Sequence, residues 1–215
     1  MWVWIGLLLL GAYHGLNPAM GWLFAVALGM QEKNGKAVVD SLLPLGAGHL
    51  ASVAVVVGVV ELASLTLPMR TIRIVAGVAL IAYGLYKLVR RRHPRWVGMR
   101  IGAKDLAFWS FLMASAHGAG LMLLPFVLAH AAQAMPVEHE HHMMMASATA
   151  APSGMMMQWW MSVGLHTLGY LAATAFVALL VYYKLGVAVL RKAWFNFDWL
   201  WVGALLVSGV LTLAL

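Results

Sequence analysis

The chain has 215 residues, of which 63% are hydrophobic and 10% charged, and its formal net charge is +7. This composition excludes an ordinary soluble domain and indicates a membrane protein built from several helices. The chain contains no cysteine, which excludes disulfides, thiolate metal sites and thiol redox chemistry.

Six apolar stretches are long enough to cross a bilayer, which requires about 20 mostly apolar residues. Proline and glycine weaken the hydrogen-bond ladder of a helix. We therefore expect the first stretch to break at Asn17-Pro18 and the fourth to break at Gly118 and Gly120. The stretches cover roughly residues 2–30, 37–62, 71–90, 104–133, 156–184 and 196–215.

The basic residues predict the orientation of these helices. Twelve of the 14 Lys and Arg residues lie around the odd-numbered connections, and only Arg70 and Arg73 lie on the other side. The positive-inside rule then places both termini outside a bacterial-type inner membrane, as a multi-pass protein in a lipid bilayer. This distribution favours topology anchors over a nucleic-acid surface, so we expect no nucleic-acid partner.

Two short strings place a histidine among helix-weakening residues within an apolar stretch. The first runs from Tyr13 to Met20 and contains His14, and the second runs from Ala116 to Met122 and contains His117. Each is followed by a stretch with another lone histidine, His49 in the first half and His166 in the second. All four histidines lie roughly 15–20 Å from one end of their stretches, at a rise of about 1.5 Å per residue, which is central in the membrane.

This correspondence predicts an internal repeat, with three helices in residues 1–98 and three in residues 99–215. Because three is an odd number, the two halves must have opposite orientations across the membrane. The expected fold is all-α, with six transmembrane helices in a 3+3 inverted repeat whose first helices are broken. Together the halves form one transmembrane domain, and transporters with this plan bind their substrates near the midplane.

The residue types in the repeat point to a transition-metal ion. Neutral imidazole is the commonest metal ligand, and thioether sulfur selects soft ions such as Cu(I). For the two methionines the alternative is simple packing, and a lone buried histidine can equally be a hydrogen-bonded core residue. The candidate ligands are His14, Met20, His49, His117, Met122 and His166.

The connection at residues 131–157 is rich in methionine and histidine, and the predicted topology places it outside. Such a biased segment resembles a metal-binding tract that captures copper, or less specifically nickel or cobalt. A periplasmic metal carrier would be its partner, and the alternative is a surface loop with accidental bias. Its candidate ligands are His139, His141, His142, Met143, Met144, Met145, Met155, Met156 and Met157.

The string His14-Gly15-Leu16-Asn17-Pro18-Ala19-Met20 resembles the first-helix signature of the nickel/cobalt-type metal permeases of the lysine-exporter-like superfamily. That signature is a histidine, four residues, an aspartate and a histidine, so Ala19 and Met20 stand at its last two positions. The second helix, with His49, and the glycine-punctuated third are also similar. The resemblance implies transition-metal transport. Our preference for copper rests on the exchange of carboxylate and imidazole for thioether.

The sequence therefore predicts a transition-metal permease that is not an enzyme and that carries copper, or alternatively nickel or cobalt. One alternative is a haem- or copper-holding membrane subunit or assembly factor of a respiratory complex. Another is an organic-solute exporter of the same superfamily, in which the histidines would line a polar path.

Overall fold

The computed structural model describes residues 2–89, 102–134, 153–186 and 197–215, where every regular element is a helix. This confirms the all-α expectation for the described residues. The elements are α1 (Trp2–Leu16), the 3₁₀ turn η1 (Pro18–Met20), α2 (Trp22–Gln31), α3 (Gly35–Ser64), α4 (Met69–Val89), α5 (Ala103–His117), α6 (Ala119–Ala134), α7 (Ser153–Leu180), the π-helical turn η2 (Val181–Leu185) and α9 (Phe197–Ala214).

Three of the described helices are long and apolar enough to cross a membrane: α3, α4 and α7 with η2. The pair α5 and α6, bent by 62° at its break, is a fourth span if it is counted as one. Helices α1 and α2 and the apolar part of α9 are shorter, so within the described residues length and composition show three to four spans, and the prediction of six is not confirmed. These helices are those of a membrane-embedded protein.

The first apolar stretch breaks where the sequence predicted. Asn17 has an extended backbone, and its side-chain oxygen accepts a hydrogen bond from the Ala19 N–H at 3.0 Å. Pro18 follows at the first position of η1, where the missing N–H of proline costs nothing. Gly21 then has a φ of +124°, which favours glycine, and the chain turns there into α2.

The second predicted break is present at Gly118, whereas Gly120 lies within α6 and does not interrupt it. Helix α5 ends at His117, and Gly118 has the left-handed φ of +71° that is common at helix C-termini. The Gly118 N–H donates to the Ser115 carbonyl oxygen at 3.0 Å, which closes the last turn. Each half of the chain thus contains a helix that ends at or just after a buried histidine.

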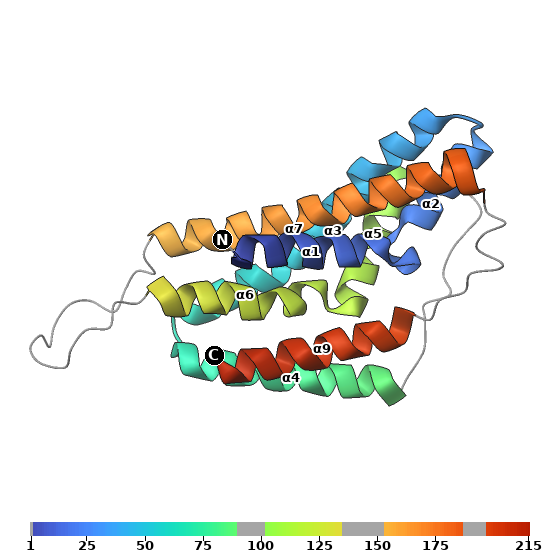
Figure 1. Cartoon of the computed structure of the whole chain (residues 1–215). Helices are drawn as coiled ribbons and strands as arrows, with labels where there is room; N and C mark the ends of the chain where they lie inside the picture. Colours follow the sequence, from blue (N-terminus) through green and yellow to red (C-terminus); the bar gives the residue numbers. More distant parts are fainter. Residues whose placement is uncertain (1, 90–101, 135–152, 187–196) are drawn as a thin grey trace, which may run out of the picture.

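The closest helix pairs join the two halves of the chain. Helix α1 packs along α7, α3 along α5, and α4 along α9 (Figure 1). Glycines allow this close approach, because a Cβ on Gly77 or Gly209 would lie 3.1 Å from the other's carbonyl oxygen. Likewise, Gly48 of α3 lies against the backbone of Ala107 and Phe111 in α5.

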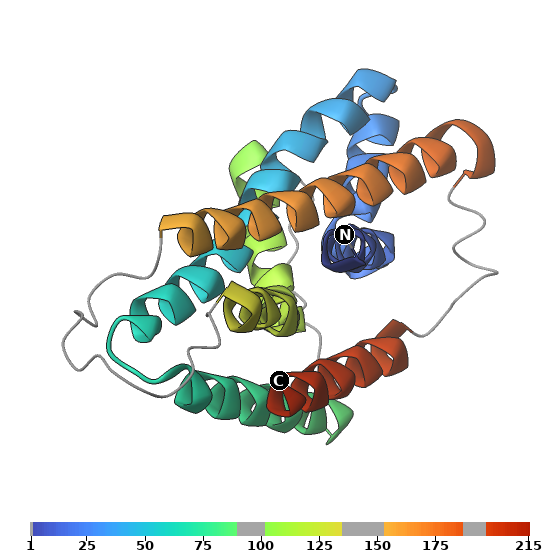
Figure 2. The same cartoon turned by 60° about the vertical axis from the view of Figure 1, so that its left-hand side comes forward.

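Helices α4 and α9 form a layer of their own on one side of the bundle, and both views show them side by side (Figures 1 and 2). Helix α6 lies between this layer and the pair of α1 and α7. The largest apolar core cluster lies among these elements and includes Trp159, Tyr170 and Trp201. The bundle therefore has an interior to which both halves contribute.

A matched pair of glycine substitutions in α3 tests the close approach of α3 and α5. In Gly48→Ala the new methyl group would lie against the Ala107 carbonyl and 2.9 Å from the Phe111 nitrogen. Overpacking of this kind costs about 1–3 kcal/mol of stability. Gly58 has nothing within 4 Å, so Gly58→Ala should instead raise stability by up to about 1 kcal/mol through helix propensity. Thermal unfolding in detergent measures both, and equal shifts would contradict the packing.

Candidate functional site: a buried histidine cluster

Four histidines lie in the interior of the bundle. His14 is in the last turn of α1 and His117 is the last residue of α5, so both adjoin the helix breaks. His49 and His166 lie within the long helices α3 and α7. None of the four side chains is more than 3% exposed. Four buried imidazoles are unusual in an apolar core, because polar groups there need hydrogen-bond partners.

Three of these imidazoles are in mutual contact. The ring centroids of His14 and His166 are 4.9 Å apart, those of His49 and His166 are 5.4 Å apart, and those of His14 and His49 are 5.8 Å apart. The three side chains come from α1, α3 and α7, which the sequence separates widely. We call His14, His49 and His166 the histidine triad.

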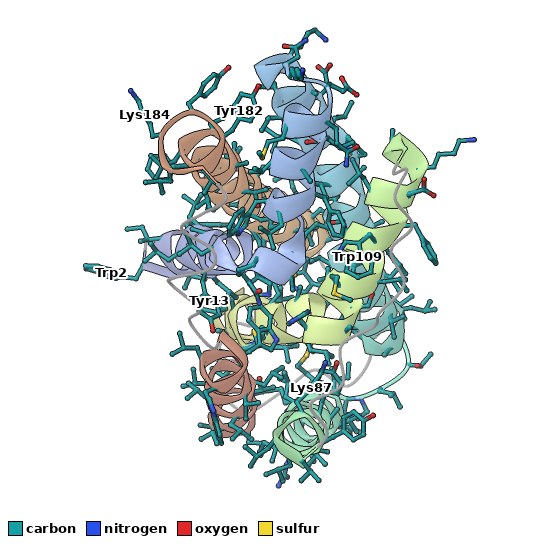
Figure 3. All side chains as sticks on the ribbon, turned by 90° about the vertical axis from the view of Figure 1, so that its right-hand side faces the viewer. Trp2, Tyr13, Lys87, Trp109, Tyr182 and Lys184 are labelled. Carbon is teal, nitrogen blue, oxygen red and sulfur yellow. The ribbon has the colours of Figure 1, made fainter. Side chains whose placement is uncertain are left out.

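His117 is joined to the triad through Trp201 of α9. The centroid of the Trp201 ring is 4.5 Å from that of His14 and 4.9 Å from that of His117, and the indole is nearly perpendicular to both imidazoles. Tyr13 stacks on Trp201 with ring centroids 5.3 Å apart and lies between α1 and α9 (Figure 3). The structure thus brings three of the four predicted histidines together and places the indole against the fourth.

The hydrogen bonds of His14 and His117 are alike. Each Nδ1 lies 2.8 Å from the carbonyl oxygen four residues earlier, that of Leu10 or Met113. Because a carbonyl oxygen only accepts, a neutral ring in this position carries its proton on Nδ1 and presents a lone pair at Nε2. This is the arrangement by which proteins orient a metal-binding histidine.

Most ring nitrogens of the triad have no hydrogen-bond partner among the described residues. They are Nε2 of His14 and both nitrogens of His49 and of His166. The Leu7 carbonyl of α1 faces the His166 ring without meeting the geometry of a full hydrogen bond. A buried polar group without a partner costs about 1–3 kcal/mol, so the triad lowers stability as it stands. Such a cost is typical of a functional site.

The spacing of the triad suits one metal ion. Imidazoles bound through metal–nitrogen bonds of about 2.0–2.1 Å in a tetrahedral arrangement have ring centroids about 5 Å apart. The observed separations of 4.9–5.8 Å bracket this value. In their present orientations, however, no three His, Cys, Asp or Glu side chains of the described residues form a group that could hold a metal. The rings must therefore rotate for their nitrogens to converge.

Tyr170 supports the triad and was missed by the sequence analysis. Its ring stacks on His49 with centroids 3.9 Å apart, and its hydroxyl donates to the Met20 carbonyl oxygen at 2.7 Å. Tyr170 therefore connects His49 of α3 to the helix break that follows α1. Its position four residues after His166, on the same face of a helix, was the signal that could have found it.

The two candidate methionines are buried, with Met20 1% and Met122 0% exposed. Both belong to the apolar core cluster that contains Trp201 and Tyr170. This is the environment of a packing side chain as well as of a ligand close to the triad. Their convergence with the imidazoles on one ion stays a prediction.

The predicted metal-capture loop is almost wholly outside the described residues. Met156 and Met157 begin the described side chains of α7 and are 45% and 62% exposed. The candidates outside the described side chains are His139, His141, His142, Met143, Met144, Met145 and Met155.

No protein-family model, curated protein or solved structure matches the chain. The class of protein is therefore defined by its own fold and site. Its regular elements in the described ranges are all helices, some of them of membrane-spanning length, and the described core contains a histidine triad.

Tyr170→Phe tests the link between Tyr170 and the helix break. The variant keeps the ring that stacks on His49 but leaves the buried Met20 carbonyl without its donor, which should lower stability by about 1–2 kcal/mol. Tyr183→Phe is the control, because Tyr183 is 65% exposed. Thermal unfolding of the purified proteins measures the difference, and identical midpoints would refute the link.

Proposed function

We propose that the chain is a transition-metal permease whose cargo ion binds to the histidine triad. The observation that carries this proposal is the triad itself. Three imidazoles from three helices have the spacing of ligands to one ion, and most of their buried nitrogens have no partner within the part of the chain that the structure describes. A bound cation would use the lone pairs that the fold leaves unpaired.

The position of the triad beside a helix end also favours a cation. His14 lies two residues before the end of α1, and the carbonyl end of a helix carries partial negative charge. Transporters with discontinuous helices use such ends to coordinate cations near the membrane midplane. The break at Asn17-Pro18 is therefore part of the proposed site.

An inverted repeat is part of the same proposal, and the contacts between helices support it. If His14 is equivalent to His117, then Ala12 is equivalent to Ser115. If His49 is equivalent to His166, then Ser52 is equivalent to Gly169.

Under these equivalences, a contact between α3 and α5 corresponds to a contact between α7 and α1. Ser52 of α3 is hydrogen-bonded to Ser115 of α5 at 2.9 Å. Its counterpart exists, because a Cβ on Gly169 of α7 would lie 3.2 Å from the Ala12 nitrogen of α1. The matching bonds from His14 to Leu10 and from His117 to Met113 support the same relation.

We propose copper as the preferred cargo, with nickel and cobalt next. Imidazole alone suits several of these ions, whereas thioether sulfur selects Cu(I). Met20 stands in the string that resembles the permease signature, and the segment at 131–157 supplies further methionines for capture. The distribution of Lys and Arg supports a bacterial-type inner membrane with both termini outside.

His49→Phe is the sharpest test of the triad as a binding site. The variant keeps a ring to stack on Tyr170 while removing two unpartnered nitrogens, so its thermal unfolding midpoint should stay the same or rise. Its affinity for Cu(I) should fall by about 100-fold or more, because a ligand is lost. Equilibrium titration in detergent measures affinity, and uptake into proteoliposomes measures transport.

Thr167→Val is the matched control. Thr167 neighbours His166 in α7 and is also buried with an unpartnered hydroxyl, so its loss should not affect Cu(I) binding. Equal affinity in wild type and His49→Phe would refute the triad as the site. Binding without uptake would indicate an assembly factor, and a Soret band in the purified protein would indicate a haem subunit. Uptake of amino acids instead of copper, nickel or cobalt would indicate an organic-solute exporter.

A further inference from the structure

Trp201 of α9 contacts both His14 and His117 in the interior of the bundle. Its ring lies within 5 Å of both His14 and His117, nearly perpendicular to each. His14 contacts His166 and His49 directly, with ring centroids 4.9 and 5.8 Å apart, whereas it shares with His117 the contact to Trp201. The indole therefore stands where the triad ends and the environment of His117 begins.

The indole is fixed in this place by its own contacts. Its Nε1–H donates to the His117 carbonyl oxygen, and Tyr13 stacks parallel to its face with an interplanar angle of 8°. The side chain is 3% exposed. A ring held on one edge and one face has a defined position, and moving it requires breaking the bond to His117.

The hydrogen bond from Trp201 to the His117 carbonyl oxygen connects the helix break at Gly118 to the layer formed by α4 and α9. Tyr83 of α4 donates to the Ala116 carbonyl oxygen, next to the carbonyl that accepts from Trp201 of α9. Helices α4 and α9 pack together as a layer (Figure 1). Displacement of this layer against α5 would therefore shift the indole relative to both histidines.

We infer that Trp201 divides the interior into two ion positions, the histidine triad and a second position at His117. This inference rests on the proposed function. An ion that binds to one site tightly enough to be captured leaves it slowly, and a second site nearby provides a way out. Trp201 separates the two positions, so the ion passes from one to the other only when the indole moves. His117 is then a relay ligand rather than a fourth ligand of the triad.

His117→Phe tests this division, because it makes the same replacement of histidine by phenylalanine as His49→Phe, so the effects of the two variants can be compared directly. The titration in detergent should give the wild-type affinity for Cu(I), since the triad is intact. The initial rate of Cu(I) uptake into proteoliposomes should fall by about tenfold, since the relay ligand is lost. If the larger ring does not fit, His117→Ala allows the same comparison.

Trp201→Phe tests whether the indole separates the two ion positions. The smaller ring cannot donate to the His117 carbonyl, so the uptake rate should rise while the affinity of the triad stays unchanged. Trp159→Phe is the control, because Trp159 is 1% exposed in the same core cluster and its Nε1 has no partner to lose. A merely structural role for Trp201 would lower stability and rate together, as in any core truncation.

The outcomes separate this inference from the proposed function. If His117→Phe weakens Cu(I) binding as strongly as His49→Phe does, all four histidines hold one ion and the division is wrong. If Trp201→Phe lowers the rate in parallel with its unfolding midpoint, the indole is core packing and the partition is wrong. If wild type binds no Cu(I), nickel or cobalt at all, the proposed function fails and the inference fails with it.

Discussion

The structure depends on one constraint, which is that a helix broken in an apolar interior exposes carbonyl oxygens that need donors. The chain meets this need in the same way at both breaks, with one tyrosine hydroxyl and one tryptophan indole at each. The donor and acceptor pairs are Trp22 with Leu16 and Tyr170 with Met20 at the first break, and Tyr83 with Ala116 and Trp201 with His117 at the second.

These aromatic donors also shape the site. Tyr170 stacks on His49, and Trp201 contacts His14 and His117, so the groups that stabilise the breaks are those that surround the imidazoles. Four backbone carbonyl oxygens at the breaks have these aromatic donors, whereas Nε2 of His14 and both ring nitrogens of His49 and His166 have no hydrogen-bond partner among the described residues. The aromatic contacts around the triad therefore stabilise the fold, whereas the unpartnered ring nitrogens lower its stability, as expected at a site that binds a ligand.

Local signals in the sequence predicted the helix breaks and the histidines of the candidate site. Asn17-Pro18 and Gly118 marked the breaks because proline and a left-handed glycine act on their own turn of the chain. The depth count put His49 and His166 at one level, and both meet in the triad. It could not separate His117 from the others, because all four histidines share the same depth, and depth contains no information about direction around a helix axis.

The sequence by itself determined the all-helical class, the helix breaks and the four candidate histidines, because hydrophobic length, proline and glycine act locally. Only the tertiary structure decided which histidines meet. The triad draws on α1, α3 and α7, and Trp201 comes from α9, so each contact depends on how helices distant in the chain cross. Those crossings are set by glycine-mediated packing between the halves, which emerges only when both halves fold together.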